Sequence, residues 1–544
     1  MRRRRSVGLV SLAVVLIALA MRTIPLYWSP LAFNVDGFKF ARLARETVRH
    51  GYLPVSTAFL NPDEYTFSTL LAICSQLTGI EPLYVAQLLT ASIGATACLF
   101  VVVVTRRIGF RLRWSRFDVR IAAFVAGVVL ATNGIFLGRS TAVTSEGLGL
   151  VFIILGIVAF ARTLRTNSRS WMVVTGLVLV LLPLTHNLST IVGGFAIVSL
   201  LALSLRSSVD KRGLLMMLVV AGFWTYVSVY YTTFKLNELS QISSAPGLFV
   251  AWVIVLVLLT VWLSRASPRI QRDLPSVVLL GGAGLITANA VTPIFPGTAT
   301  TDKLVFVYVL PIALVGIVAI HGIPRLVGAG LDGSTVFALL LGTLSIIGFA
   351  LTGGLTVPYQ DLAIRAQTFI HVPFAVLAGV GVILLTRRST SRSIQAALIV
   401  VVLLCSVVSA PLAFSGLRAT SAQPLVTQPE FETATFATTY ADGWTSDGHM
   451  TRLAFKYYPK QTDANVSQLA VYEWLHGGKV PSCPVVSQQS WTTVGAQLFP
   501  SSPTKISPDS YATSSQTRNL VYSNSGTDPL IFTIPTTGRK RCNS

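Results

Sequence analysis

Long apolar runs separated by short polar segments make up most of the chain. Thirteen such runs of 15 to 21 residues can be identified before the last quarter of the sequence. Each is close to the roughly 20 residues with which a helix crosses about 30 Å of hydrocarbon. The pattern predicts an α-helical polytopic membrane protein with about 13 transmembrane helices. The runs lie at 7–21, 84–104, 119–137, 146–161, 171–185, 188–205, 213–231, 247–264, 274–291, 303–320, 334–352, 368–386 and 394–414.

The pattern changes after the last apolar run. Residues 415–544 mix Ser, Thr, Pro and aromatic residues with short apolar segments. Two of these segments, 519–522 and 530–534, flank a Gly turn and are typical of β-strands. We therefore expect a transmembrane module at 1–414, with a long first external loop at 22–83, and a small mixed α/β domain over the remaining C-terminal residues.

Composition and charge narrow the class of protein. Hydrophobic residues make up 52% of the chain and charged residues 12%. Soluble proteins carry about 25% charged residues, so this composition excludes a soluble protein. The formal net charge of +21 would suit nucleic-acid binding if the basic residues formed one face. They recur instead in short loops at every second crossing, so nucleic acid is not an expected partner.

The distribution of Lys and Arg among the loops predicts the orientation in the membrane. The N-terminus and the loops after every second crossing hold 23 basic and 4 acidic residues, whereas the remaining loops hold 9 of each. Cytoplasmic loops are the ones that carry an excess of Lys and Arg. We expect a cell-membrane protein with a cytoplasmic N-terminus and, after 13 crossings, an extracellular C-terminal domain.

The N-terminal sequence allows a second interpretation. Arg2 to Arg5, the apolar run and an Ala-Leu-Ala sequence at 18–20 together resemble a secretory signal with a cleavage site. Either the first helix is retained or residues 1–20 are removed. The rest of the topology is the same in both cases.

The five cysteines fall into two groups. Cys74, Cys98 and Cys405 lie in or beside apolar segments, where cysteine packs as a small hydrophobic residue. Cys483 and Cys542 both fall in the domain predicted to be extracellular, where the compartment permits a disulfide between them. The sequence contains no CxxC pair and no zinc-like spacing, which excludes those kinds of site.

The first external loop contains the most informative carboxylate, Asp36. It begins an amphipathic helix that Gly51 ends, with Phe40 on the apolar face and Lys39 and Arg42 on the basic face. Such a helix lies in the membrane interface with its basic face toward lipid phosphates. Asp36 is then either a helix cap or a general base at the membrane surface beside a group of cations.

Four more polar residues are predicted on the same side of the membrane. Arg139 and Glu146 belong to the loop at 138–150, where Glu146 enters the next apolar run. A carboxylate there is costly unless it is paired, with Arg139 for example, or faces a wet cavity. His186 ends the fifth crossing, as a structural hydrogen-bonding group or as part of a site. Arg365 precedes the twelfth crossing, either as an interfacial anchor or as an anion ligand.

Together these residues suit sugar transfer from a lipid-phosphate donor. The leaving phosphate is a weak base and needs no general acid, but it needs charge stabilisation from cationic side chains or a divalent metal. Asp36 could activate the acceptor as a general base, and Glu146 with Asp36 could hold Mg²⁺ or Mn²⁺. Membrane lipids, the lipid-linked donor and the acceptor are the expected partners. The candidate substrate-binding residues are Arg365, Lys39, Arg42, His186 and Arg139.

At these motifs the chain resembles the GT-C superfamily of membrane glycosyltransferases, which use polyprenyl-phosphate-linked sugars. The segment from Asp36 through the amphipathic helix to Gly51 looks like the family's first-loop motif, whose Asp is catalytic. Arg365 with Pro373 looks like the family's late phosphate-binding helix. The resemblance implies an inverting glycosyltransferase with a polyprenyl- or dolichyl-phosphate-linked donor, in which Asp36 is the base and Arg365 the phosphate ligand.

The segment at 138–147 is similar to the second-loop carboxylate motif of oligosaccharyltransferase catalytic subunits. It departs from that motif at Thr144, where the family has Asp, and the C-terminal domain lacks the family's WWDYG motif. The expected function is therefore transfer of a sugar to a lipid-linked glycan or a protein, in protein glycosylation or cell-envelope assembly. Oligosaccharyltransferase-like en bloc transfer, a secondary transporter or lipid-glycan flippase, and a non-catalytic scaffold are the alternatives.

Overall fold

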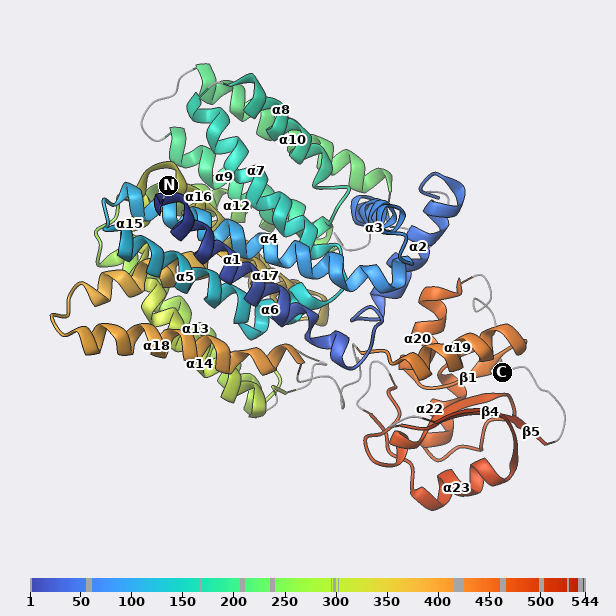
Figure 1. Cartoon of the computed structure of the whole chain (residues 1–544). Coiled ribbons are helices and arrows are strands. Elements are labelled where there is room, and N and C mark those ends of the chain that lie inside the picture. The colour runs from blue at the N-terminus through green and yellow to red at the C-terminus, as the bar shows by residue number, and fades with distance from the viewer. Residues whose placement is uncertain are drawn as a thin grey trace.

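The computed structural model describes residues 2–54, 61–166, 168–205, 211–234, 240–294, 296, 300–301, 303–414, 425–459, 466–498, 503–525, 528–536 and 542. It consists of a bundle of long helices beside a smaller C-terminal region that contains a sheet (Figure 1). The helices form where the sequence has its apolar runs, because every backbone N–H and C=O within lipid must be satisfied inside its own segment. This confirms the predicted fold class.

All thirteen predicted apolar runs fall on helices. Among the described residues, ten helices are long and apolar enough to cross a membrane, and the pair α5 and α6, bent by 61°, brings the number to 11. Two further apolar helices, α8 and the described part of α14, are shorter than the rest. The helices are α1 (Arg2–Thr23), α4 (Pro82–Arg111), α5 (Arg116–Thr132), α6 (Gly134–Thr141), α7 (Glu146–Thr166), α8 (Arg169–Leu181), α9 (Asn187–Leu205), α10 (Lys211–Thr233), α12 (Pro246–Arg265), α13 (Ile270–Val291), α14 (Lys303–Ile320), α16 (Gly330–Gly353), α17 (Val357–Thr386) and α18 (Arg392–Ser409).

Small residues let the central helices approach closely. A Cβ atom on Gly342 of α16 would lie 2.7 Å from the backbone nitrogen of Ala196 in α9, and one on Gly379 of α17 would strike the carbonyl oxygen of Ala122 in α5. Lipid tails are as apolar as leucine, so close van der Waals packing replaces the hydrophobic effect between such helices. The packing of α16 and α17 against α9 and α5 therefore fixes the centre of the bundle.

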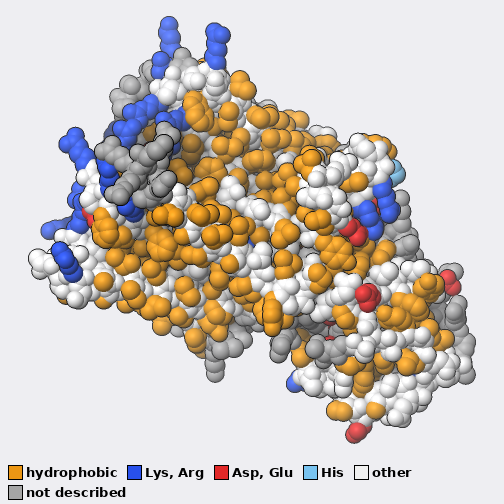
Figure 2. Space-filling view, in the orientation of Figure 1, with side chains coloured by type: hydrophobic (Ala, Val, Ile, Leu, Met, Phe, Trp, Pro, Cys, Tyr) orange, Lys and Arg blue, Asp and Glu red, His pale blue; other side chains and the backbone are white. Residues whose placement is uncertain are grey.

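The surface of the bundle is apolar along its sides and basic at one end. Figure 2 shows hydrophobic side chains over the helices and Lys and Arg side chains gathered at the end farthest from the C-terminal region. Several helices carry an Arg at their C-terminal end: Arg111, Arg165, Arg265 and Arg387. An apolar band bounded on one side by cations is the surface that a bilayer accommodates.

The first loop contributes two short helices at the opposite end of the bundle. α2 (Asp36–His50) ends at Gly51, whose φ of 75° belongs to the left-handed region, and α3 (Tyr65–Thr78) follows. The predicted helix from Asp36 to Gly51 is therefore confirmed. Two other short helices, α11 (Ser240–Ser244) and α15 (Ile323–Leu326), lie between longer ones.

The C-terminal region is a five-stranded mixed sheet with helices around it. The strand order is β2-β1-β3-β5-β4, in which β1 pairs parallel with β2 and β3, and β5 pairs antiparallel with β3 and β4. The two strands that the sequence predicts fall within β4 and β5. The elements are β1 (Trp444–Thr445), β2 (Val466–Ser467), β3 (Val485–Gln488), β4 (Arg518–Asn524) and β5 (Leu530–Pro535), with α19 (Gln428–Tyr440), α20 (Gly448–Tyr457), α22 (Leu469–Leu475) and α23 (Pro508–Gln516).

One hydrophobic core joins the C-terminal region to the first loop. The ring of Phe38 in α2 lies 5.6 Å from the ring of Phe431 in α19 and 6.1 Å from that of Tyr457 in α20. The same core contains Phe67 of α3 and Trp444 of β1, both fully buried. Aromatic pairs of this kind contribute about 0.5–1.5 kcal/mol beyond the burial of their area. The sheet region is thus docked on α2, as Figure 1 shows.

This docking corrects the expectation that α2 lies in the membrane interface with its basic face toward lipid. The first half of α2 is buried, including Lys39 at 8% exposure and Arg42 at 3%. An amphipathic pattern shows that one face of a helix is buried, but it does not say what buries it. Here α3 and α4 cover one side and α20 of the C-terminal region covers another.

Candidate functional site

Asp36 faces the C-terminal region. A turn at Asn34, which has a φ of 95°, directs the chain into α2 so that Asp36 is its first residue. The residue at the N-cap position is Val35, and no side chain caps the helix there. The Asp36 carboxylate instead forms an ion pair of 3.0 Å between Oδ1 and the Nζ atom of Lys456 in α20. The structure therefore favours a role other than capping for this carboxylate.

Three cations act on Asp36. Burial raises the pKa of its carboxyl, but the charges of Lys456, Arg452 and Lys39 outweigh that effect and hold the pKa below its usual value. The carboxylate is therefore ionised at neutral pH. Its side chain is 41% exposed, so it lies at the rim of the junction between α2 and α20 and not inside the core. An ionised, accessible carboxylate can accept a proton from a bound hydroxyl or amide.

The two predicted cations of α2 are paired with carboxylates. Lys39 forms an ion pair with Glu64, which lies in the turn before α3. Arg42 lies 3.8 Å from Glu46, one turn further along α2. Both cations are buried, so direct contact between Arg42 and a substrate is not favoured by this geometry. Glu64 was not predicted as a site residue, although two adjacent acids before an apolar helix are a visible signal.

Within the first loop, the turn before α3 is anchored to the turn between α8 and α9 and to α10. The backbone N–H of Thr66 donates to the carbonyl oxygen of Leu184 at 3.1 Å, and the hydroxyl of Tyr230 in α10 donates to that of Pro62 at 3.0 Å. Glu64, the partner of Lys39, lies between these two anchored residues. The loop is therefore held against the turn that carries His186.

His186 and Arg365 meet at this turn. The Nη2 atom of Arg365 in α17 lies 3.1 Å from Nε2 of His186. A guanidinium only donates hydrogen bonds, so Nε2 is the acceptor and the imidazole is neutral. Its Nδ1 atom lies 2.9 Å from the hydroxyl of Ser189 and 3.2 Å from the backbone nitrogen of the same residue. Asp361 is the second partner of Arg365, at 3.9 Å.

Glu146 begins α7 beside the same turn. Its side chain is buried at 6% exposure, and within the described part of the chain its Oε1 atom has no hydrogen-bond partner. Both residues are described, and the ion pairs found among the described residues do not join them, so the structure does not support pairing with Arg139, one of the two alternatives left open by the sequence. Arg139 is half-buried on α6, close enough for its charge to act on His186. A buried carboxylate oxygen without a partner is costly in a structure that has no use for it.

Close packing connects the two sides of the site. A Cβ on Gly37 would lie 3.0 Å from the Cβ atom of Val143, and the N–H of Val143 donates to the carbonyl of Phe33 at 2.9 Å. One turn into α7, Gly149 packs directly on Ser189 and on the Cβ atom of His186. Together with the contacts of Lys456 and Arg365, they bring the starts of α2, α7 and α9, the end of α20 and the first third of α17 to one end of the bundle.

The predicted site residues therefore gather at one end without touching one another in a single cluster. Asp36 pairs with Lys456, His186 pairs with Arg365, and Glu146 has an oxygen left over. Among the described residues, no hydrogen bond or ion pair joins Asp36, Glu146 and Arg365 directly. The sequence did not reveal Lys456 or Arg452, because nothing local in the C-terminal region marks them as site residues.

The described residues do not provide a set of ligands that matches the predicted metal site. Within the described residues, no group of three or more His, Cys, Asp or Glu side chains is placed to hold a metal ion. Asp36 is engaged with a lysine, and Glu146 offers one free oxygen. Mg²⁺ and Mn²⁺ prefer several oxygen ligands. We therefore derive no step through a metal.

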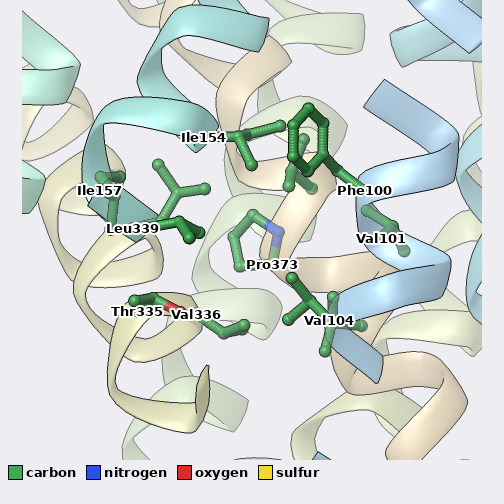
Figure 3. Close-up of a pocket in the computed structure, with 12 residues that line it drawn as sticks. Phe100, Val101, Val104, Ile154, Ile157, Thr335, Val336, Leu339 and Pro373 are labelled. Carbon is green, nitrogen blue, oxygen red and sulfur yellow. The ribbon is translucent and has the colours of Figure 1, made fainter. Parts of the chain in front are cut away.

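A small recess deeper in the bundle is separate from this site. Figure 3 shows its lining, with Phe100 and Val104 of α4, Ile154 of α7, Leu339 of α16 and Pro373 of α17. Thr335 supplies its polar side chain. The recess lies two turns beyond Arg365 along α17 and offers no group for chemistry.

Comparison with known proteins finds similarity among solved structures. No family model matches the chain, and no curated protein matches it significantly. The oligosaccharyltransferase AglB from Archaeoglobus fulgidus, in complex with an inhibitory peptide and a dolichol-phosphate, is 15% identical with a TM-score of 0.44. That match covers 79% of this chain and 58% of AglB, so the chain spans little more than half of that enzyme.

Two further structures have the same general likeness. The apo form of the Archaeoglobus fulgidus oligosaccharyltransferase is 13% identical with a TM-score of 0.49, over 97% of this chain and 75% of the other. ArnT from Cupriavidus metallidurans, bound to undecaprenyl phosphate, is 14% identical with a TM-score of 0.33, over 96% and 97% of the two chains. Membrane glycosyltransferases of the class that the sequence resembles are thus among the proteins similar in structure. At such identities the likeness concerns the fold alone.

Proposed function

We propose that the protein is a membrane glycosyltransferase that moves a sugar from a polyprenyl- or dolichyl-phosphate-linked donor to a lipid-linked glycan or protein acceptor. The observation that carries this proposal is the environment of Asp36. A half-exposed carboxylate lies among three cations at the end of an apolar helix bundle. Such a place can bind a lipid whose tail lies in the bilayer and whose head carries a phosphate.

In the proposed reaction Asp36 is the general base. It takes the proton from the acceptor hydroxyl or amide as the acceptor atom forms a bond to the anomeric carbon of the sugar. The bond between that carbon and the phosphate oxygen breaks, and the electron pair stays with the polyprenyl phosphate. Attack from the face opposite the phosphate inverts the configuration. The leaving phosphate needs no proton, because it is a weak base.

Arg365 is the proposed fixed ligand of the leaving phosphate. It donates through a planar fork that matches phosphate oxygens. Its contact with His186 is with a neutral group, and its ion pair with Asp361 is long, at 3.9 Å, with the Asp361 side chain 61% exposed. Cations placed where negative charge develops lower the barrier to transfer. In this assignment His186 orients the guanidinium, and the free oxygen of Glu146 is available for a hydroxyl of the sugar or acceptor.

The proposed site lies at the extracellular face. The Lys and Arg side chains at the opposite end of the bundle (Figure 2) are the ones that the positive-inside rule assigns to the cytoplasm. With the N-terminus at that end, the C-terminal region faces outward, in line with the proposed division into a membrane module at 1–414 and an extracellular domain at 415–544. Labelling of single cysteines with an impermeant reagent in intact cells checks this orientation.

Glycan analysis in cells tests the function itself. We expect a strain that lacks the gene to accumulate a glycan, or an unmodified acceptor, that is shorter by the unit transferred, and the wild-type gene to restore it. Asp36→Asn should fail to restore the glycan although the protein reaches the membrane, because the base is lost. Mass spectrometry of extracted glycans measures the difference.

The matched control is Asp509→Asn, which removes one carboxylate from an exposed position in α23. It should restore the glycan fully, since Asp509 lies far from α2 in the chain and outside the junction. Full restoration by Asp36→Asn as well would reject the assignment of the base. An unchanged glycan in the deletion strain would reject the proposed function.

A further inference from the structure

The C-terminal region contributes a lysine to the candidate site. Lys456 is the ion-pair partner of Asp36, and Arg452 lies one turn before it on the same face of α20, where its charge also acts on Asp36. The side chain of Lys456 is 28% exposed. It reaches the site from a different part of the chain than every predicted site residue.

The ion pair is not needed to hold α20 in place. Phe38, Phe431 and Tyr457 already form an aromatic cluster between α2 and the C-terminal region. The guanidinium of Arg45 donates to the hydroxyl of Tyr457 at 2.9 Å and lies 4.5 Å from the centre of its ring. Exposed ion pairs contribute only about 0–1 kcal/mol to stability. A docking role therefore gives a weak account of Lys456.

Positive charge gathers around Asp36 at this junction. Lys456 lies 3.0 Å from its carboxylate, and the charges of Arg452 and Lys39 also act on it. Clustered positive charge at a half-exposed site attracts an anionic ligand. Among the reactants of the proposed function, the phosphate of the donor carries that charge.

We propose that Lys456 is a phosphate-binding residue, which leaves Asp36 and grips the phosphate of the lipid-linked donor when the donor binds. Lysine suits this exchange, because it is a point charge on a long flexible side chain. The exchange releases the carboxylate of Asp36 to face the acceptor, so donor binding prepares the base. This inference rests on the proposed function and deepens it.

The charge of the donor explains why the contact strengthens during transfer. A sugar linked through phosphate to a lipid is a phosphodiester with one negative charge. When the bond to the sugar breaks, the phosphate becomes a monoester with up to two. A cation already at the phosphate therefore stabilises the transition state more than the bound substrate, which is the condition for catalysis.

Binding of polyprenyl phosphate to the full-length protein in phosphatidylcholine nanodiscs tests the proposal. We expect Lys456→Met to weaken binding roughly tenfold or more, as loss of a charge-assisted hydrogen bond does, and Lys456→Arg to retain most of it. Lys479→Met, which removes an exposed lysine of the same region, is the matched control and should bind as wild type does. Equal binding by Lys456→Met and wild type overturns the proposal.

A double-mutant comparison separates the exchange from simple repulsion. Asp36→Asn releases Lys456 from its partner, so it should tighten polyprenyl phosphate binding severalfold, and the gain should vanish when Lys456→Met is added. A gain that persists in the double variant means that Asp36 merely repels the phosphate, which overturns the exchange. If Lys456→Met alone melts early, unchanged affinity of Asp36→Asn still overturns it.

Two further binding experiments identify the ligand. Inorganic phosphate should compete only at far higher concentration than the lipid, and competition at equal concentration overturns a lipid ligand at Lys456. Polyprenol without phosphate should not bind in a Lys456-dependent way. If wild type binds no polyprenyl phosphate, the proposed function fails together with this inference, whereas equal binding by Lys456→Met overturns the inference alone.

Discussion

The two sides of the candidate site are held by different forces. On the bundle side, His186, Glu146 and Arg365 are positioned by tightly packed helices, in which Gly149 lies against Ser189 and His186. On the C-terminal side, Asp36 and Lys456 are positioned by charges, by aromatic contacts and by a region with its own sheet and disulfide. One side is rigid because atoms fill space, and the other contains a pair that can separate.

This difference assigns different tasks to the two sides. Arg365 contacts the neutral His186 and, at 3.9 Å, the exposed Asp361, and in the proposed reaction it is the fixed cation. Lys456 is paired with Asp36, and in the proposed exchange it is the cation that responds to the ligand. Substitutions on the two sides of the site should therefore have different effects.

The largest expected effect concerns how the C-terminal side is held together. Cys483 and Cys542 form a disulfide, the pairing that the sequence allowed, and they are 59 residues apart. Closing a loop of that length stabilises the folded region by up to about 4 kcal/mol. Replacing both cysteines with alanine should lower the melting temperature of the sheet region, followed by tryptophan fluorescence of Trp444 and Trp491.

Cys74→Ser is the control for that prediction, because Cys74 is a free cysteine in α3. It should leave the melting curve unchanged in oxidising buffer. If the double-alanine variant has the same melting temperature as the wild type, the stability of the C-terminal side does not depend on the disulfide.

The next largest effect concerns the fixed cation of the bundle side. Arg365→Ala should lower sugar transfer by roughly 100- to 1000-fold, as loss of one charge-stabilising donor does elsewhere. Arg365→Lys should recover part of the loss, since the charge remains but the fork does not. Initial rates with a polyprenyl-phosphate-linked sugar measure both.

Arg269→Ala removes an exposed arginine just before α13 and should transfer sugar at the wild-type rate. Wild-type activity in Arg365→Ala would assign Arg365 to the membrane interface as an anchor. The bundle side of the site would then have no cation assigned to phosphate binding.

A smaller effect tests the packing of the bundle side. A methyl group on Gly149 would strike the Ser189 hydroxyl and lie 3.0 Å from His186 Cβ, whereas one on Gly147 would find only an ordinary contact of 3.6 Å with Ile93. Both substitutions to alanine favour the helix equally. Gly149→Ala should therefore be less stable than Gly147→Ala by about 1–3 kcal/mol, measured by thermal melting in detergent.

Equal melting temperatures for these two variants would mean that α7 and α9 can separate at no cost. The position of His186 would then not be fixed by packing. In that case the contrast between a rigid side and an exchanging side of the site would be lost.

The smallest effect is a pH dependence confined to the C-terminal side. Burial lowers the pKa of His449, but the charges of Glu430 and Asp447 raise it above its usual value, with Arg452 opposing them. The stability that this pair supplies is complete below pH 6.5 and is lost as the pH rises through the raised pKa. His449→Gln should flatten the alkaline side of the stability curve of the sheet region.

The stability that Glu430 contributes depends on pH in the opposite direction. Burial raises its pKa, but His449 and three hydrogen-bonding contacts bring it below its usual value, so its contribution is present above pH 4.5 and is lost as the pH falls through the lowered pKa. Glu430→Gln should therefore lower stability at neutral pH. A melting temperature that changes neither as the pH rises above 6.5 nor as it falls below 4.5 would contradict both assignments.

The sequence predicted those features of the structure that depend on local patterns of residues. Apolar runs predicted every long helix, and the amphipathic pattern with Asp36 and Gly51 at its ends predicted α2. The role of Lys456 could not be predicted, because its partner lies 420 residues earlier and only tertiary packing brings them together. The surroundings of α2 were misjudged for the same reason, since the region that covers it follows the last crossing.

The most direct test of the account measures binding and transfer together in one purified variant. Asp36→Asn in nanodiscs should bind polyprenyl phosphate at least as tightly as wild type, yet transfer sugar from the lipid-linked donor at least roughly 100-fold more slowly. That combination is what a base paired with a phosphate-binding lysine predicts. Transfer at the wild-type rate by Asp36→Asn would contradict it.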